Sequence, residues 1–557
     1  MYGAELLIQL LLEQKVDTIF GYPGGAVLPI YDALFDCDNI RHVLVRHEQA
    51  AAHAADGYAR ATGKPGVTLV TSGPGATNTI TGIATAYMDS VPLIVLTGQV
   101  PTHLLGLDSF QEVDIFGMTM SVTKQNYIVT DLAELPRIVR EAFHIATTGR
   151  PGPVLIDLPK DIMTALLESP YDSTVQQPIY IEGYHPDSPI NESKLDEITK
   201  RLATAKQPVL LVGGGCIAGE SPVLLQELIS RCNFPVVATL MGIGAFPSAH
   251  PLHLGMLGMH GTVAANRAIQ AADVVICLGV RFSDRVSGNR KAFSPNSFKI
   301  QIDIDNAELN KNIGIDIALQ GSVEQALLGI LDRIPELNHS AWHEKISIWA
   351  KHAPAFKPSN DGQLTPQEVI RCIDNVTNSD TIISTDVGQH QIWTAHHYQF
   401  GMPRSFLTSG GLGTMGYGFP AAIGAAAAFP DRQVICISGD GSFQMNVQEI
   451  MTAVDLGLNV KVAILKNGYL GMVRQWQQLF LNNRYSAVQI SSPDFAALAK
   501  TFGAHGLSAR TPNEAQAIIE MALSIDGPVI MEFEVTEEAN VYPIVPPGAS
   551  NEEMIEE

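Results

Sequence analysis

The sequence predicts an α/β protein made of three doubly wound parallel-sheet domains. Short runs rich in Val, Ile and Leu, most of them ending in a Gly-containing turn, alternate with helical patterns along the chain. Its 557 residues exceed what one hydrophobic core usually supports, so about three domains of ordinary size are expected. Two segments rich in Pro, Ser and Asn, residues 165–195 and 333–365, interrupt the alternation and are predicted to be linkers.

The linkers divide the chain into predicted domains at residues 1–165, 190–335 and 365–557. The first segment, MYGAELLIQLLLEQ, is predicted to form an amphipathic helix, because Gln9 and Glu13 break its apolar run and no basic leader precedes it. Strands are expected in the runs VTLVTSG, PLIVLTG, PVLLVGGG, DVVICLG, QVICISG and VKVAILKN.

Composition excludes several classes of function. A formal net charge of -22 repels phosphate backbones and anionic lipid, so general nucleic-acid or membrane-surface binding is not expected. No run approaches the roughly 20 apolar residues of a membrane-spanning helix. The six cysteines are scattered without a CxxC pair, which is typical of a reducing compartment and favours a cytoplasmic protein.

The first and third predicted domains share a pattern of strand, SG-x-G turn, helix and strand. The segment VTLVTSGPGATNTITGIATAYMDSVPLIVLTG can be laid over VICISGDGSFQMNVQEIMTAVDLGLNVKVAILKNG. This similarity suggests an internal duplication. The matching turns carry Pro74 in the first copy and Asp440 in the second, so only the second offers a carboxylate to a metal.

A carboxylate and an amide follow two neighbouring strands of the third domain. Asp440 lies in the GDG turn after QVICIS, and Asn467 follows VKVAIL 27 positions later. The carboxyl ends of adjacent parallel strands meet at one edge, and hard oxygen donors suit Mg²⁺, which can in turn hold a diphosphate. A lone GDG is more often a capped turn, but its spacing to Asn467 favours a metal site.

The GDG motif followed by an asparagine at this distance resembles the signature of thiamine-diphosphate enzymes. Further segments, in order along nearly the whole chain, are similar to those of acetohydroxyacid synthases. These segments are RHEQAAAHAADGYARATG (46–63), TSGPGATN (71–78), GRPGPVLIDLPKD (149–161), GMLGMHGT (255–262), GVRFSDR (279–285), DVGQHQ (386–391), GGLGTMGYG (410–418) and LGMVRQWQ (470–477).

The resemblance implies that the domains bind, in chain order, the pyrimidine of thiamine diphosphate, FAD, and the diphosphate with Mg²⁺. Glu48, by default only a first-turn charge of a helix, is then expected to hydrogen-bond the aminopyrimidine and promote the tautomer that activates the cofactor. Met415, by default a core residue, is expected to support the bent cofactor. The expected Mg²⁺ ligands are Asp440, Asn467 and the backbone carbonyl of Tyr469. Further cofactor residues implied by the resemblance are Gly388, Gln389, His390, Gly413, Gly441, Ser442 and Met472.

The segments GMLGMHGT and GVRFSDR resemble the flavin-binding segments of the anabolic synthases, which hold FAD without using it as a redox partner. Three residues depart from the family pattern: Lys466 stands beside the metal asparagine, and Ser283 and Ser322 stand where aspartates are common. The residues that the resemblance assigns to FAD are Arg150, Gly214, Gly215, His260, Gly261, Thr262, Gly279, Arg281, Arg285 and Asp303.

Arg281 and Trp476 are expected to select the substrate, although an arginine after a strand is by default a surface charge and a tryptophan a packing residue. The resemblance implies that Arg281 binds the carboxylate of the second 2-keto acid and that Trp476 favours 2-ketobutyrate. Phe110, Gln111 and Lys160 are expected to line the entrance to the site.

The implied reaction decarboxylates pyruvate and joins the remaining two-carbon unit to a second keto acid. Pyruvate as acceptor gives 2-acetolactate and 2-ketobutyrate gives 2-aceto-2-hydroxybutyrate, in branched-chain amino-acid synthesis. The alternatives are a pyruvate oxidase or a 2-keto acid decarboxylase on the same scaffold, and a catalytically silent cofactor-binding subunit. In this family Glu48 and Asp440 come from different subunits, which implies a homo-oligomer, at least a dimer. A separate small regulatory subunit is a further implied partner.

Overall fold

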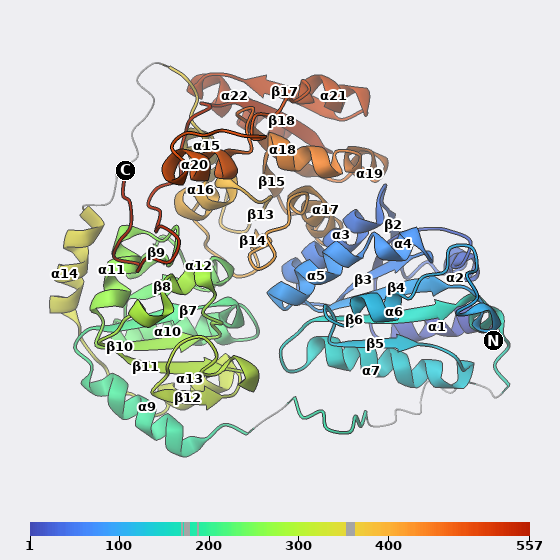
Figure 1. The fold of residues 1–557 in the computed structure, drawn as a ribbon, viewed down its shortest axis with the longest axis horizontal. Coiled ribbons are helices and arrows are strands. Elements are labelled where there is room, and N and C mark those ends of the chain that lie inside the picture. Colours follow the sequence, from blue (N-terminus) through green and yellow to red (C-terminus); the bar gives the residue numbers. More distant parts are fainter. Residues whose placement is uncertain (169–170, 172–178, 187–188, 352–361) are drawn as a thin grey trace.

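The computed structural model describes residues 1–168, 171, 179–186, 189–351 and 362–557, and parts of both predicted linkers lie outside these ranges. The described residues form three six-stranded parallel sheets flanked by helices, as the sequence predicted (Figure 1). In the described part of the chain, none of the helices combines the length and the apolar character needed to span a bilayer.

The first sheet has the order β2-β1-β3-β4-β6-β5, and every neighbouring pair is parallel. Its strands are β1 Thr18–Tyr22, β2 Arg41–Leu44, β3 Gly66–Val70, β4 Leu93–Gln99, β5 Gln125–Ile128 and β6 Pro153–Pro159. Its helices are α1 Gly3–Glu13, α2 Leu28–Phe35, α3 Glu48–Thr62, α4 Pro74–Thr77, α5 Ile80–Asp89, α6 Ile115–Thr119, α7 Leu135–Thr147 and α8 Lys160–Thr164, with 3-10 turns η1 Thr102–Leu104 and η2 Leu132–Glu134.

The second sheet has the order β12-β11-β10-β7-β8-β9, again parallel throughout. Counted within the domain this is the doubly wound order 3-2-1-4-5-6 of dinucleotide-binding sheets. Its strands are β7 Pro208–Val212, β8 Val236–Ala238, β9 His253–Met256, β10 Val274–Leu278, β11 Phe298–Asp303 and β12 Ile317–Gln320. Its helices are α9 Glu192–Thr204, α10 Ser221–Cys232, α11 Val263–Ala271, α12 Asp284–Ser287, α13 Val323–Leu331 and α14 Ser340–Lys351, with 3-10 turns η3 Gly214–Cys216, η4 Leu240–Gly242, η5 Arg290–Ala292 and η6 Asn306–Glu308.

The third sheet, β14-β13-β15-β16-β18-β17, repeats the order and the parallel pairing of the first, in agreement with the predicted duplication. Its strands are β13 Ile382–Thr385, β14 Phe406–Leu407, β15 Val434–Gly439, β16 Val460–Lys466, β17 His505–Ala509 and β18 Val529–Glu534. Its helices are α15 Pro366–Val376, α16 Gln389–His397, α17 Gly418–Ala428, α18 Asp440–Phe443, α19 Glu449–Asp455, α20 Gly471–Phe480, α21 Phe495–Thr501 and α22 Pro512–Ser524, with the 3-10 turn η7 Gln444–Asn446.

Helix α14 lies inside the predicted linker 333–365, so residues 340–351 of this segment are helical. The helix is anchored by Trp342, which is 2% exposed and donates its indole N–H to the carbonyl of Pro208 at 3.0 Å. Ile346, one turn later, joins the same apolar cluster. Trp342 and Ile346 are four residues apart, which places both side chains on one helix face. The polar segments on either side of the helix made this spacing hard to recognise in the sequence.

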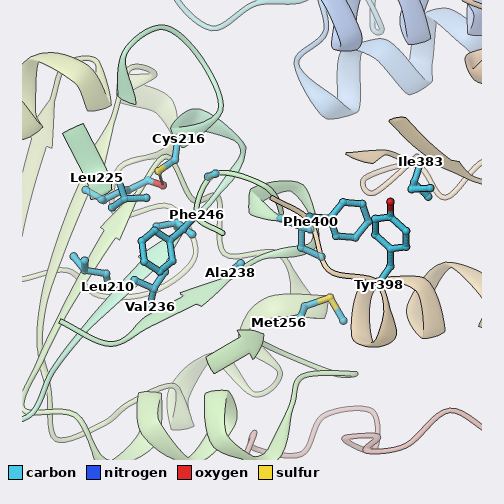
Figure 2. Close-up of a cluster of buried hydrophobic side chains, with 14 of the residues drawn as sticks. Leu210, Cys216, Leu225, Val236, Ala238, Phe246, Met256, Ile383, Tyr398 and Phe400 are labelled. Atoms are coloured by element: carbon cyan, nitrogen blue, oxygen red, sulfur yellow. Dashed lines mark hydrogen bonds between the residues drawn. The ribbon is translucent and has the colours of Figure 1, made fainter. Parts of the chain in front are cut away.

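One continuous apolar core joins the second and third domains. Phe400, between α16 and β14, lies close to Ala238 and Met256 of the second sheet on one side and to Tyr398 on the other (Figure 2). The rings of Phe400 and Tyr398 have centroids 4.8 Å apart. The two domains therefore share a buried interface instead of being connected only by the chain.

The first and third domains meet where α3 crosses α17 between their sheets (Figure 1). Glycines allow the two backbones to touch: a Cβ at Gly57 would lie 2.2 Å from the carbonyl oxygen of Ala421, and one at Gly424 would lie 1.9 Å from that of Ala54. Since a real Cβ does not approach so closely, even alanine at either position would force the helices apart.

We expect Gly424→Ala to destabilise the protein by about 2 kcal/mol, the usual cost of overpacking a well-filled interface. The measurement is the midpoint of thermal unfolding of the purified protein. Gly314→Ala is the matched control, because a Cβ at Gly314 meets nothing within 4 Å, and it should leave the midpoint unchanged. Equal midpoints for the two variants would show that the close crossing of α3 and α17 is not needed for stability.

Candidate active site

A cavity lies at the carboxyl ends of β13, β15 and β16, next to the point where the strand order of the third sheet reverses. Such switch points are where open α/β sheets bind ligands. The lining belongs to residues 387–535, within the third domain. The predicted cofactor and metal residues that line it are Gly388, Gln389, His390, Met415, Asp440, Gly441, Ser442, Asn467, Tyr469 and Met472.

Asp440 is held rigidly beside this cavity. It begins α18 directly after β15 and is 1% exposed. Its carboxylate accepts hydrogen bonds from the backbone N–H of Gly468 at 3.0 Å, from the hydroxyl of Ser492 at 2.9 Å and from the N–H of Gly441 at 3.1 Å. Burial raises the pKa of Asp440, although these hydrogen bonds oppose the shift. A nearby cation would offset the cost of the buried charge.

Asn467 follows β16, whose last residues pair with the end of β15 through Leu465 and Gly439. The side-chain oxygen of Asn467 accepts a hydrogen bond from the N–H of Tyr469 at 3.0 Å. The parallel pairing therefore brings the carboxylate, the amide and the Tyr469 segment to one wall, as the spacing predicted. The described residues contain no cluster of three or more His, Cys, Asp or Glu side chains suited to a metal, so other oxygen donors would have to supply part of any metal shell here.

His390 and Gln389 line the cavity from the start of α16. The His390 ring packs on glycine backbone, since a Cβ at Gly439 would lie 3.0 Å from its Nδ1. Its Nε2 is buried without a hydrogen-bond partner among the described residues, and burial lowers the pKa of His390 to about 3. Gln389, in contrast, donates to Gln475 and to the carbonyl of Ala539, both at 2.9 Å.

Met415 projects from the segment 408–417, which is tied down at both ends by buried carboxylates. Asp386 accepts from the N–H groups of Gly416 at 2.7 Å and Gly418 at 3.3 Å. Asp89, from the first domain, accepts from Gly410 at 3.0 Å and from Gly411. Sequence reasoning did not assign a role to Asp386, although the motif DVGQHQ begins with it. The predicted residue Gly413 lies in the same segment at φ +71°, outside the cavity lining.

Glu48 is the first residue of α3, directly after the N-cap His47, and its carboxylate accepts from the Asn78 amide at 2.9 Å. A Cβ at Gly75 would lie 3.3 Å from Glu48 Oε1, so the carboxylate faces the turn that corresponds to GDG. Glu48 is not among the described residues that line the cavity of the third domain. Within one chain, the two predicted halves of the site are therefore separate.

The predicted entrance residues also belong to the first domain. Gln111 has φ +59° and packs on the turn, since a Cβ at Gly73 would lie 2.9 Å from its Cα. Phe110 is 88% exposed and Lys160 begins α8 after β6. An aromatic ring so exposed next to a strained residue is typical of a surface that meets a ligand or another chain.

The glycines predicted to bind FAD meet at the switch point of the second sheet. Gly214 and Gly215 follow β7, Gly279 follows β10, and Asp303 ends β11. A Cβ at Gly215 would lie 2.9 Å from the Cα of Gly279, so no larger residue fits this crossing. Burial raises the pKa of Asp303 to about 6, and its carboxylate accepts from the N–H of Asp305 at 2.9 Å.

His260, Gly261 and Thr262 follow β9 at the same domain. Nδ1 of His260 is buried without a partner among the described residues, and burial lowers the pKa of His260 to about 3. Gly261 packs tightly, since a Cβ there would lie 2.5 Å from Oδ1 of Asn266. Thr262 caps α11 by accepting from the N–H of Ala265 at 3.1 Å. Thr262 thus has a structural role independent of any cofactor.

The arginines predicted to bind substrate or FAD have distinct partners. Arg285 lies over the Trp476 ring, with Cζ 5.6 Å from its centroid, so it links the second and third domains. Arg150 contacts Glu308 at 2.9 Å and Asp305 at 3.5 Å. Arg281 is mostly buried, its pKa is lowered by burial, and its guanidinium makes no hydrogen bond or ion pair with the described residues. Arg281 is thus the arginine still available to an anionic ligand.

The two serines that depart from the family pattern both begin helices. Ser322 is the N-cap of α13 and its hydroxyl accepts from the N–H of Gln325 at 3.1 Å. Ser283 occupies the N-cap position of α12 without a side-chain cap, while its carbonyl accepts from the hydroxyl of Ser287 at 2.9 Å. Serine at an N-cap replaces aspartate at little cost, so Ser322 preserves the local structure.

Comparison with known families matches a part of each of the three domains. The N-terminal TPP binding domain of thiamine pyrophosphate enzymes matches residues 1–118, their central domain matches residues 195–330, and their C-terminal TPP binding domain matches residues 386–533.

Curated relatives match over the full length. The chain is 45% identical to the acetolactate synthase isozyme 2 large subunit of Escherichia coli strain K12, covering all of both chains. It is 44% identical to the acetolactate synthase large subunit of Haemophilus influenzae, over 99% of this chain and 98% of that one. It is 47% identical to the acetolactate synthase of Arthrospira platensis, over 99% and 97% respectively.

The chain belongs to the acetolactate synthase large-subunit family. This membership confirms the resemblance inferred from the motifs, and the three family domains confirm the predicted fold class. Within this family of thiamine pyrophosphate enzymes, the first and third sheets belong to the two TPP binding domains, so the duplicated pattern in the sequence lies in these two domains.

Proposed function

We propose that this chain is the catalytic subunit of an acetolactate synthase, which decarboxylates pyruvate and joins the two-carbon remainder to a second 2-keto acid. The observation that carries the proposal is the cavity at the switch point of the third sheet, lined by Asp440, Asn467 and Met415, in a chain so similar to acetolactate synthases. When bound, thiamine diphosphate supplies the carbanion chemistry that breaks the bond to CO₂.

The cavity suits a diphosphate bound through a divalent cation. Nε2 of His390 is a buried nitrogen with no partner among the described residues and can donate to a phosphate oxygen. Asp440, Asn467 and the carbonyl of Tyr469 supply oxygen donors, the set that Mg²⁺ prefers. Gly441 leaves space on this side of the cavity, because a Cβ at this position would lie 2.9 Å from the Leu470 side chain. These features support Mg²⁺ as the second resident group.

Two copies of the chain are needed for one complete site. The cavity lining comes from the third domain, and Glu48 lies on the first domain outside it. The exposed Phe110 and the strained Gln111 lie on the same domain as Glu48 and offer a surface for the cavity of a second copy. We infer a homodimer at least, in which Glu48 of one copy holds or moves a proton at the pyrimidine ring bound to the other.

The second sheet is proposed to bind FAD as a structural group. Its strand order is that of dinucleotide-binding sheets, and the crossing of Gly215 and Gly279 leaves bare backbone at the switch point. The unpartnered Nδ1 of His260 offers a buried polar contact in the same domain. Asp303 at the end of β11 can accept from a ribose hydroxyl.

The acceptor is proposed to be a 2-keto acid whose carboxylate binds Arg281. The guanidinium is mostly buried and has no ion-pair partner among the described residues, so a carboxylate would restore the missing hydrogen bonds. Trp476, on α20, is fixed from one side by Arg285 and can pack against the alkyl group of 2-ketobutyrate. The names of the relatives as large subunits also favour a separate small subunit as partner.

The test incubates purified protein with pyruvate, thiamine diphosphate, Mg²⁺ and FAD, with 2-ketobutyrate added in competition. We expect both acetohydroxy acids, a bias towards 2-aceto-2-hydroxybutyrate, and flavin absorbance that stays in the oxidised form. Acetate with reduced flavin would assign the chain to the pyruvate oxidases, and acetaldehyde alone would assign it to the decarboxylases.

A further inference from the structure

Helix α19 of the third domain binds the turn that leads into α3 of the first. Glu449, the first residue of α19, accepts hydrogen bonds from the backbone N–H of Arg46 on both carboxylate oxygens, at 3.0 and 3.1 Å. At the other end of the helix, Asp455 forms an ion pair with the Arg46 side chain. The segment between β2 and α3 is therefore held at two points by one helix of another domain.

Glu449 is an unusual residue for a purely structural contact, because its side chain is 0% exposed. Its other hydrogen bond comes from the hydroxyl of Thr452 at 2.6 Å, and its carboxylate also faces the N–H of His47. Burial raises the pKa of Glu449 to about 7, with these hydrogen bonds opposing the shift. A buried carboxyl is costly, so its position on two consecutive N–H groups indicates a specific task.

The two N–H groups belong to Arg46 and His47, the residues immediately before Glu48. His47 is the N-cap of α3, and its Nδ1 accepts from the N–H of Gln49 at 3.1 Å. The direction in which the Glu48 side chain leaves the helix is set by these few peptide planes. A shift of the turn would move the Glu48 carboxylate, which otherwise has the Asn78 amide as its hydrogen-bond partner.

The first domain makes a contact in the opposite direction, through a different position of the corresponding helix. Helix α5, which corresponds to α19, ends at Asp89, and this carboxylate accepts from the N–H groups of Gly410 and Gly411 before Met415. On the same helix, Thr85 hydrogen-bonds the hydroxyl of Thr414 at 2.7 Å. Each domain thus holds, by a carboxylate of this helix, the segment of the other domain that carries a predicted cofactor residue.

We propose that Glu449 is a positioning residue for Glu48, acting through the backbone N–H groups of Arg46 and His47. The inference rests on the proposed function of Glu48 and extends it to a residue of the third domain. Glu48 is proposed to act at the cavity of the partner copy. Glu449 therefore supports the site in the partner copy and not the cavity in the third domain of its own chain. A loosened turn lowers turnover by misplacing the carboxylate, while the pyruvate and diphosphate contacts stay intact.

The experiment compares Glu449→Gln and Glu449→Asp with the unmodified holoenzyme. We expect Glu449→Gln to lower kcat about tenfold, with KM for pyruvate changed less than about twofold. The rate of deuterium exchange at the reactive carbon of the bound cofactor should fall by the same factor. Glu449→Asp keeps the charge on a shorter side chain. If the glutamine variant does not fold, kcat, KM and the deuterium exchange rate are measured on this variant instead. Glu192→Gln is the control, because it removes an exposed carboxylate on α9 that does not contact this turn, and it should change kcat less than about twofold.

A double-mutant cycle distinguishes positioning from general damage. If Glu449 acts through Glu48, adding Glu449→Gln to Glu48→Gln lowers the exchange rate no further. Losses that multiply in the double variant, or an exchange rate unchanged by Glu449→Gln, would overturn the inference. A Glu48→Gln variant with normal exchange would instead overturn the proposed role of Glu48, so the two failures can be told apart.

Discussion

Glu48→Gln is expected to lower the rate of acetohydroxy acid formation by about 100-fold or more. The substitution keeps the size of the side chain and can still accept from the Asn78 amide, which now bonds the carboxylate at 2.9 Å. It removes the group that can hold or move a proton at the pyrimidine ring of the cofactor. The measurement is kcat at saturating thiamine diphosphate and Mg²⁺, so that weaker cofactor binding does not contribute.

Glu192→Gln is the control for the helix-dipole contribution of a first-turn glutamate. Glu192 begins α9 as Glu48 begins α3, but it is exposed and pairs with Arg333 on the surface. Removing its charge should change stability by less than about 1 kcal/mol and leave kcat unchanged. If Glu48→Gln retained full turnover, Glu48 would be only a helix-end charge, and the proton would have to be moved by another group.

The juxtaposition of the proposed metal ligands could be predicted because these residues follow neighbouring strands of one parallel sheet. Asp440 and Asn467 are 27 positions apart in sequence, yet the pairing of Gly439 with Leu465 brings them to one edge. Gly215 and Gly279 also follow strands, β7 and β10, but they were assigned through the family resemblance and not by this reasoning. The local sequence is sufficient to predict the juxtaposition of Asp440 and Asn467, because the carboxyl ends of all strands in a parallel sheet lie at the same edge.

Contacts between domains could not be predicted in the same way. Nothing in the local sequence indicates that Arg285, and not Arg281, stacks on the Trp476 ring, because this contact depends on how the second and third domains dock. Glu449 was equally hidden, although the duplication offered one signal: nine residues after the paired turns, the first copy has Ile83 where the second has Glu449. A charged residue in the position of a buried apolar one indicates a dedicated partner.

The duplication also explains why only one of the paired turns offers a carboxylate for the proposed metal site. Pro74 and Asp440 occupy equivalent turns, and each begins a short helix after a buried strand. Proline at the first helical position stabilises the turn but offers no ligand, whereas Asp440 places a carboxylate where a cation can neutralise it. The first copy instead presents Glu48 to its own turn, beside Gly75. Under the proposed function, divergence at these positions assigns the diphosphate end of the cofactor to one sheet and the pyrimidine end to the other.

Asp440→Asn is expected to lower activity by about 100-fold at ordinary Mg²⁺ concentrations, because the neutral amide loses most of the attraction for a divalent cation that a buried carboxylate provides. The apoprotein should be as stable as the unmodified one or more stable. Burial raises the pKa of Asp440 above its unfolded value, so the stability it contributes is present at low pH and is lost as pH rises through the folded-state value. At neutral pH the ionised carboxylate is therefore a cost that asparagine removes.

The measurement combines activity across a Mg²⁺ titration with thermal unfolding in the presence and absence of Mg²⁺ and thiamine diphosphate. The unmodified protein should unfold at a higher temperature when both are present, and Asp440→Asn should lose most of that shift. Asp494→Asn is the matched control, because Asp494 caps α21 by accepting from the N–H of Ala497 at 2.8 Å, outside the cavity lining. If Asp440→Asn kept the Mg²⁺-dependent rise in unfolding temperature, the cation would bind to other ligands. If the apoprotein of this variant were less stable than the unmodified one, the buried carboxylate would instead stabilise the fold.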